Sequence, residues 1–148
     1  MLRYGRSDPL PFILLSEEQK SMRSGHTIFV DIDYEKLMVH KKNAIRQTQE
    51  ITRVLGDIEF GSDEDAIQIS TPRYWAVGCD LKNLKKLDEV LQNNILLSAD
   101  CSVLLLAEVS LTYMDVQSAN EVIKWASKLT NRELIHTVDL SSWIKASN

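Results

Sequence analysis

Three short apolar runs, each followed by a segment with helical periodicity, constrain the fold of this chain more than any other feature. The runs are rich in β-branched and aromatic residues, and they predict β-strands over residues 27–33, 74–79 and 102–108. The third run is continuously apolar from Val103 to Ala107, which is typical of a central parallel strand covered on both faces. Strands that alternate with helices predict an α/β fold with a parallel sheet, and no internal repeat or linker divides the chain.

Apolar residues at three- and four-residue spacing follow each predicted strand. They predict helices over residues 34–55, 84–91 and 116–129, and Asp115 is suited to be the N-cap of the third helix. The residues that we expect to face the core are Leu37, Met38, Ala44, Ile45, Ile51, Leu55, Leu84, Leu87, Val90, Leu91, Val116, Ala119, Val122, Ile123, Ala126 and Leu129.

The first predicted helix also has a basic face, formed by Lys36, Lys41, Lys42, Arg46 and Arg53. A solvated face is the simpler interpretation of these residues, and an RNA-facing surface of modest strength is the alternative. Five of the ten residues in the next segment, 56–65, are acidic, so we expect a solvated surface loop there.

Composition and charge exclude several classes of protein. The 148 residues are 44% hydrophobic and 26% charged, which is close to the average for soluble globular proteins and argues against disorder of the whole chain. Seventeen Lys and Arg residues against 21 Asp and Glu residues leave a net charge of −4. That charge argues against a free-standing nucleic-acid-binding module, although not against an enzyme that meets RNA through a local patch.

The remaining reactive residues do not form a recognisable site. Cys79 and Cys101 lack the spacing of a disulfide scaffold or a zinc knuckle, so we expect a reduced, cytoplasmic protein. The three histidines show no ligand spacing, which predicts no metal site. Ser110 and Ser118 have no neighbouring His-acid arrangement, so hydrolase chemistry is poorly supported. The longest apolar run is too short to span a bilayer, and we expect no membrane contact.

Each predicted strand ends in or just before an acidic residue, namely Asp33, Asp80 or Glu108. Ligands bind beyond the carboxyl ends of the strands in open α/β sheets, so these carboxylates would line one edge of the sheet. Asp33 can accept hydrogen bonds from both ribose hydroxyls of a nucleoside, and Asp80 can accept one from an adenine amine while the Leu81 amide donates to a ring nitrogen. Glu108 can pair with an ammonium group. Acidic residues also end strands simply because loops are polar. The contacts to a ribose, an adenine and an ammonium group, taken together, nevertheless fit S-adenosyl-L-methionine better than a dinucleotide.

Three ordered motifs cover most of residues 1–129. Residues 104–127 read LLLAEVSLTYMDVQSANEVIKWAS, residues 78–81 read GCDL, and residues 29–34 read FVDIDY. They resemble the central Ala-Glu-x-x-Leu-x-Tyr-Met segment, the Gly-x-Asp-Leu element and the acidic second strand of the leucine carboxyl methyltransferase family. Within that family, DPLPF (8–12), DIDY (31–34) and STPRYWAVGCDL (70–81) are more similar to the branch that acts in wybutosine biosynthesis than to the branch that methylates the phosphatase 2A catalytic subunit.

The resemblance implies a Rossmann-like methyltransferase fold with a mostly parallel sheet, and a carboxyl methyltransferase that uses S-adenosyl-L-methionine. It assigns Tyr113 to the acceptor carboxylate and the following residues to the cofactor: Gly5, Asp33, Asp80, Leu81 and Glu108. In the wybutosine branch the acceptor is the amino-carboxypropyl side chain of a modified guanosine in phenylalanine tRNA. The alternatives are a protein C-terminal leucine carboxyl methyltransferase and a catalytically inactive remnant. We expect a monomer.

The sequence departs from the family at both ends. The family has a Gly-x-Gly turn near Gly5, and its two glycine places are taken here by Tyr4 and Arg6. We expect the family's first strand and upstream helix to be missing before Met1, and residues 130–148 do not resemble the family's continuation. The sequence therefore predicts a partial, truncated domain over residues 1–129 and a divergent C-terminal tail over 130–148.

Overall fold

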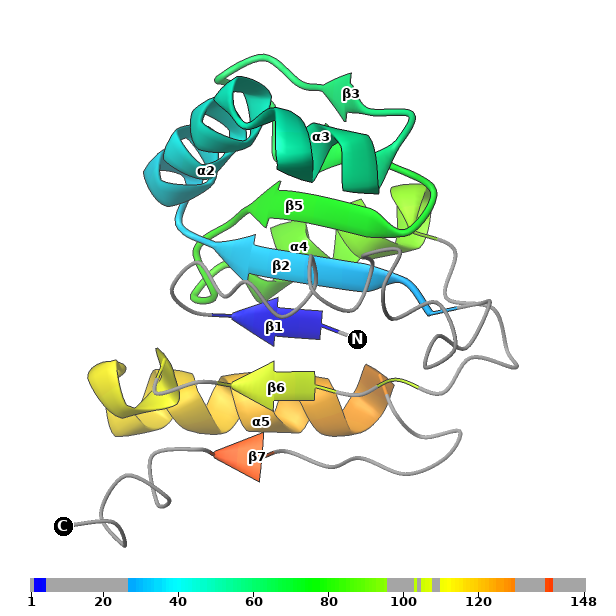
Figure 1. Ribbon diagram of the computed structural model, residues 1–148. Helices are drawn as coiled ribbons and strands as arrows, with labels where there is room; N and C mark the ends of the chain where they lie inside the picture. Colours follow the sequence, from blue (N-terminus) through cyan, green and yellow to red (C-terminus); the bar gives the residue numbers. More distant parts are fainter. Residues whose placement is uncertain are drawn as a thin grey trace, which may run out of the picture.

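A mixed sheet with helices on both of its faces forms the framework of the protein (Figure 1). The computed structural model describes residues 27–95, 103, 105–107 and 110–129, together with the backbone of two strands at 2–4 and 138–139. Within these residues the strand order is β3-β4-β5-β2-β1-β6-β7. The strands are β1 (Leu2–Tyr4), β2 (Phe29–Asp33), β3 (Glu59–Phe60), β4 (Ile67–Ser70), β5 (Tyr74–Gly78), β6 (Leu105–Ala107) and β7 (Val138–Asp139).

The described strands β5, β2, β1, β6 and β7 are parallel to one another, and the antiparallel pairs among the described strands are β3 with β4 and β4 with β5. The helices are α2 (Glu35–Gln47), α3 (Gln49–Leu55), α4 (Leu84–Asn94) and α5 (Val116–Leu129), with a 3-10 turn η2 at Ser110–Tyr113. The expected α/β class with a mostly parallel sheet is therefore confirmed.

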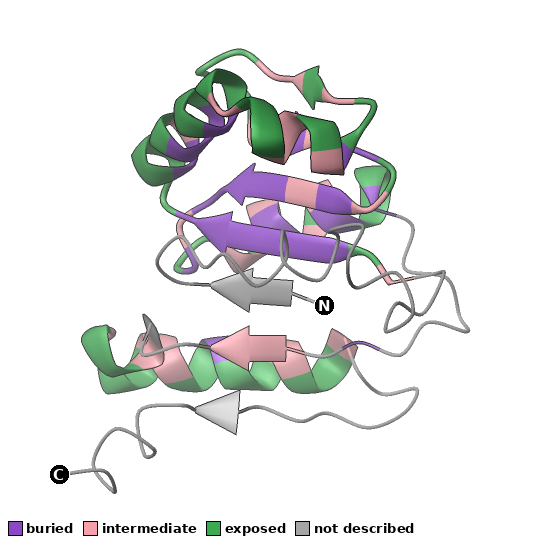
Figure 2. Cartoon of the chain, viewed as in Figure 1, coloured by how far each residue is buried: buried purple, intermediate pink, exposed green. Residues whose placement is uncertain are grey.

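Two apolar cores lie on opposite faces of the sheet, because β2 is buried along its whole length and its side chains alternate between the faces (Figure 2). Phe29 packs with α2, α3 and Tyr74 of β5 on one face. Val30 and Ile32 pack with α4 and Val122 of α5 on the other face. Each face of the central strands is thus covered by a different pair of helices.

Most of the expected elements are present. The predicted strands at 27–33 and 74–79 correspond to β2 and β5, and β6 lies in the second half of the third predicted strand. Leu87 and Leu91 are fully buried on α4, as expected from their spacing. Asp115 caps α5, because its Oδ1 accepts a hydrogen bond of 2.9 Å from the Ser118 amide.

The expectation that the first strand is missing was wrong. β1 lies at Leu2–Tyr4 and pairs in parallel with β2 on one side and β6 on the other, so it is central to the sheet. Three residues are too short a run to give a periodicity signal. The C-terminal segment 130–148 likewise contributes a strand, β7, which pairs with β6.

The single helix predicted over residues 34–55 is divided at Thr48, which has an extended backbone. The Thr48 hydroxyl donates to the Ala44 carbonyl at 2.8 Å, and the Thr48 amide turns instead to Ile45. The side chain thus takes the acceptor that the helical amide would use, and the helix ends there.

The predicted inward faces were too wide. Leu37, Val116 and Ile123 are 52%, 78% and 50% exposed, whereas Trp125 packs against the core of α4 and α5. Apolar residues at the edges of a helical stripe point to the margin of the sheet, and the sequence pattern alone cannot separate the margin from the centre.

The interpretation of the basic and acidic segments also needs correction. Lys41 and Lys42 are buried and do not belong to a solvated face. The Lys42 ammonium donates to the Gly61 carbonyl at 2.8 Å and to Asp63 at 2.7 Å, so it holds the acidic segment against α2. That segment contains β3 and is not simply a solvated loop. Within the described residues, no helix is long and apolar enough to cross a membrane.

Candidate functional site

The carboxyl ends of β2 and β5 bring Asp33 and Asp80 to the same edge of the sheet. The two strands are parallel, and Asp33 is in register with Gly78. The Cys79 amide donates to the Asp33 carbonyl at 2.8 Å, which extends the pairing beyond the strand. The juxtaposition expected from the sequence is therefore present for these two residues.

The Asp33 side chain is almost completely buried and is oriented by a backbone hydrogen bond. It is 7% exposed, and its Oδ1 accepts a hydrogen bond of 2.7 Å from the Tyr34 amide. Burial raises the pKa of this carboxyl above 3.8, while the Tyr34 hydrogen bond and the charge of Lys41 act in the opposite direction and the charge of Asp31 adds to the rise. The carboxylate is thus oriented by the backbone at the point where the chain turns from β2 into α2.

A tight turn after β5 positions Asp80 and Leu81. The Asp80 Oδ1 accepts from the Lys82 amide at 2.9 Å, and the Asp80 carbonyl accepts from the Asn83 amide at 2.8 Å. The Leu81 side chain is 4% exposed and anchors the turn in the core of α4 and α5. Asn83 then caps α4 by accepting from the Lys86 amide at 3.2 Å. Asp80 itself is partly exposed at the edge, where a ligand can reach it.

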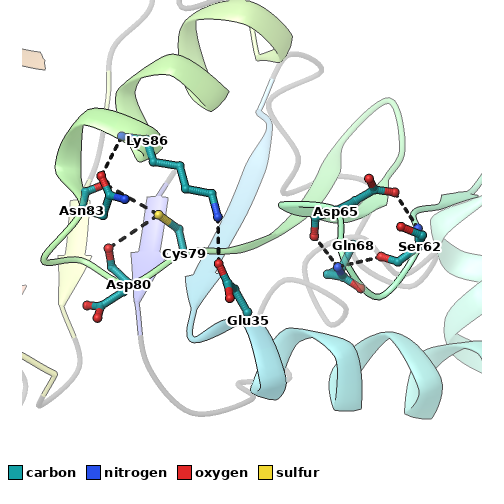
Figure 3. A network of polar contacts seen from close by, with 8 residues as sticks. All are labelled: Glu35, Ser62, Asp65, Gln68, Cys79, Asp80, Asn83 and Lys86. Atoms are coloured by element: carbon teal, nitrogen blue, oxygen red, sulfur yellow. Dashed lines mark hydrogen bonds and ion pairs between the residues drawn. The ribbon is translucent and has the colours of Figure 1, made fainter.

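The Cys79 thiol lies beneath this turn (Figure 3). It is fully buried and within 3.6 and 3.8 Å of the Asp80 and Asn83 carbonyls. Burial raises the pKa of the thiol, which disfavours the reactive thiolate. Cys79 therefore supports the turn rather than acting as a nucleophile.

An ion pair near this edge links the helices that cover the two faces of the sheet. Lys86 of α4 donates to Glu35 of α2 at 2.8 Å, as Figure 3 shows. α2 also begins unusually close to β5, because a Cβ on Gly78 would lie 2.9 Å from the Glu35 Cα. Gly78 is thus needed for the close approach of α2 that places Asp33 and Tyr34.

A buried polar cluster behind Asp33 was missed by the sequence analysis. Asp31 Oδ2 lies 2.5 Å from the Lys41 ammonium and accepts from the Tyr74 hydroxyl at 3.0 Å. All three residues are buried. The available signal was an acidic residue in the middle of an otherwise apolar strand, which requires a partner once it is buried.

The other predicted site residues are not brought into this group by the described part of the structure. Tyr113 ends η2 and is 86% exposed. Gly5 and Glu108 directly follow β1 and β6 in the sequence, but both lie outside the described residues. Among the described residues, no group of three metal-ligating side chains is present.

No protein-family model matches the chain. Individual curated proteins do match it, and each of the following is named tRNA wybutosine-synthesizing protein 4. The chain is 68% identical over 124 residues to the protein of Aspergillus fumigatus, which covers 84% of this chain and 12% of that protein. It is 62% identical over 124 residues to that of Emericella nidulans, with 84% and 11% covered.

A more distant relative, from Saccharomyces cerevisiae, is 32% identical over 133 residues, which covers 86% of this chain and 19% of that protein. The chain thus spans only about an eighth of the length of the Aspergillus and Emericella relatives. Over most of its length, this chain is a homologue of the fungal proteins named tRNA wybutosine-synthesizing protein 4.

Proposed function

We propose that this chain forms the cofactor-binding part of an S-adenosyl-L-methionine-dependent carboxyl methyltransferase that acts in wybutosine biosynthesis. One observation carries the proposal. Asp33 ends β2, and Asp80 lies in the turn that follows the adjacent parallel strand β5, at the same edge of the sheet, in a chain that is 68% identical over 124 residues to a protein named for wybutosine synthesis.

The strand order supports a Rossmann-like fold. In chain order, the parallel strands are β1, β2, β5, β6 and β7, and their spatial order β5-β2-β1-β6-β7 is third, second, first, fourth and fifth. This is the order of doubly wound nucleotide-binding sheets, in which the ligand lies at the carboxyl edge where the order reverses. The reversal falls between β1 and β6, which the sequence follows with Gly5 and Glu108.

The residues at this edge fit the hydrogen-bonding groups of the cofactor. We assign Asp33 to the two ribose hydroxyls, since its backbone-anchored carboxylate is a strong acceptor. Asp80 is assigned to the adenine amine, and the Leu81 amide to a ring nitrogen. Gly5 is assigned to the turn where the backbone comes close to the cofactor. Glu108 is assigned to the ammonium group of the methionine part.

The proposed reaction asks little of acid–base groups. S-adenosyl-L-methionine supplies, when bound, a methyl group activated by its sulfonium. An acceptor carboxylate is ionised at neutral pH and needs no general base. The residues at the edge therefore have to align the acceptor and exclude water. Tyr113, highly exposed at the end of η2, is assigned to the acceptor side.

The relatives' name supports a tRNA substrate. We infer that the acceptor is the amino-carboxypropyl side chain of the modified guanosine in phenylalanine tRNA, and that the chain binds that tRNA as a monomer. The net charge of −4 and the burial of Lys41 and Lys42 leave only local basic patches for this contact.

Isothermal titration of the chain with S-adenosyl-L-homocysteine tests cofactor binding. The expected result is measurable affinity that Asp33→Ala abolishes. Asp57→Ala removes the same charge from an exposed position after α3 and should retain binding. A folded chain that binds nothing at millimolar ligand would refute the proposed cofactor site and favour the alternative of a catalytically inactive remnant.

Transfer of labelled methyl groups tests the acceptor. The chain is incubated with labelled S-adenosyl-L-methionine and either hypomodified phenylalanine tRNA or the phosphatase 2A catalytic subunit. Label is expected in the tRNA, and label found only in the protein would establish the alternative leucine carboxyl methyltransferase.

A further inference from the structure

A charged cluster is buried directly behind the carboxylate that we assign to the ribose. Asp31 and Asp33 are two positions apart on β2, so their side chains leave the strand on the same face. On that face, Lys41 of α2 lies 2.5 Å from Asp31, and Tyr74 of β5 donates to the same Oδ2 at 3.0 Å. Side chains from α2 and β5 therefore meet at the same oxygen of Asp31.

Stability alone is a poor explanation for this cluster. Removing an ammonium and a carboxylate from water is costly, and well-packed apolar residues often replace a buried ion pair without loss of stability. The side chains of Lys41 and Asp31 are only 7% and 8% exposed. The surrounding residues Phe29, Met38 and Ile45 form an apolar core that an apolar pair could complete.

The neighbourhood of Asp33 suggests what the cluster does. The charged and titratable groups described around it are Asp31 on its own strand, Lys41 on α2 and Tyr74 on β5. Glu35, at the start of α2, is paired with Lys86 of α4. Burial disfavours the ionised form of Asp33, whereas the Tyr34 backbone hydrogen bond favours it most. Of the two neighbouring charges, Lys41 favours the ionised form and Asp31 opposes it, and the effect of Lys41 is the larger.

We propose that Lys41 is a positioning residue that stabilises the Asp33 carboxylate for the ribose hydroxyls, with its own ammonium held by the Asp31 oxygen that also accepts from the Tyr74 hydroxyl. This inference rests on the proposed cofactor site. Lys41 belongs to α2, which packs on the sheet face that carries Phe29, and its proposed role is exerted through Asp33 and not through a contact with the ligand. Asp31 prevents the ammonium from swinging to Asp33, which would occupy the acceptor oxygens that the ribose needs.

The pH dependence of S-adenosyl-L-homocysteine affinity, measured between pH 4 and 8, tests the proposal. As the pH is lowered, the affinity should fall with a midpoint at the pH where Asp33 takes up a proton. Asn cannot take up that proton, so Asp33→Asn should show no such midpoint. Lys41→Met removes the favourable charge, so the midpoint should move to higher pH. Asp31→Asn removes the unfavourable charge, and the midpoint should move down.

Opposite shifts in the two single variants are the signature of an electrostatic role, because a purely structural role would weaken binding equally at every pH. Lys41→Met leaves Asp31 buried without its cation and can fail to fold. The double variant Asp31→Asn/Lys41→Met avoids this, and it should show a smaller upward shift, since the Lys41 effect exceeds that of Asp31. Circular dichroism identifies the variants that are folded.

Midpoints that stay in place, or that move in the same direction in the folded single variants, would refute the role of Lys41. An absence of ligand binding by the unaltered chain would instead refute the proposed function, so the two failures are distinct.

Discussion

Substitution of Gly78 by Ala should weaken both the fold and the cofactor site. The added Cβ would lie 2.9 Å from the Cα of Glu35 and 3.4 Å from its Cγ. Carbon atoms pack at about 3.5–4.0 Å, so the backbone at the start of α2 has to retreat by about 0.6 Å or more. A backbone atom cannot rotate out of the way, and the strain is therefore passed to α2 or β5.

The cost can be worked out from two opposing effects. Overpacking of this kind costs about 1–3 kcal/mol, and the lower entropy of the unfolded chain with Ala returns about 0.4–1 kcal/mol. The central values leave a net loss of about 1.3 kcal/mol in the free energy of unfolding. That loss lowers the melting temperature of a chain of this size by about 3–5 °C. Urea denaturation and thermal melts measure it.

A matched variant separates the site from the fold. Gly56→Ala forces an alanine to adopt a φ of 76° in open space, which costs about 1–3 kcal/mol far from the sheet edge. Both variants should be destabilised, but only Gly78→Ala should also lose affinity for S-adenosyl-L-homocysteine, because the Tyr34 amide that holds Asp33 moves with α2. Unchanged stability of Gly78→Ala, or equal loss of affinity in both variants, would refute this reasoning.

Three further variants test the cores and the buried charges. Tyr74→Phe removes the hydroxyl that bonds Asp31 at 3.0 Å and should cost about 1–3 kcal/mol in urea denaturation; a loss below 0.5 kcal/mol, on the order of experimental error, would show that the bond is dispensable. Leu87→Ala removes most of a fully buried side chain and should lower the free energy of unfolding by about 2–5 kcal/mol. A much smaller loss would show instead that the neighbouring residues move in and fill the cavity. Asp33→Asn should stabilise the fold at neutral pH: the folded pKa is raised above 3.8, so the unaltered protein loses stability as pH rises from 3.8 through the folded pKa, and the variant does not. Thermal melts at pH 3 and pH 7 would contradict this sign if the gain appeared only at pH 3.

The sequence predicted the elements that have a long and regular apolar pattern. β2, β5, α4 and the N-cap of α5 could be found because each combines periodicity with a clear boundary residue, such as Asp115. The juxtaposition of Asp33 and Asp80 followed from the parallel sheet alone, since carboxyl ends of parallel strands meet at one edge.

The errors have a common physical origin in tertiary contacts. Lys41 and Lys42 were assigned to a solvated face because a one-dimensional pattern cannot show the carboxylates that receive them. The break at Thr48 depends on a side-chain hydrogen bond, and the three residues of β1 derive their strand conformation from two neighbours. The cofactor and acceptor roles of all six assigned residues stay predictions: Gly5, Asp33, Asp80, Leu81, Glu108 and Tyr113.

The buried Lys42 gives the β3–β4 hairpin an internal cation. Its ammonium donates to the Gly61 carbonyl and to Asp63. A metal ion bound by a loop is also held by backbone and carboxylate oxygens, but here the positive charge is part of a side chain of α2. The conformation of this loop should therefore be indifferent to chelators. With 2% of its surface exposed, Lys42 should react with amine-labelling reagents far more slowly than the exposed Lys36, and only when the hairpin opens. The labelling rate of Lys42 would thus report how often the β3–β4 hairpin detaches from α2.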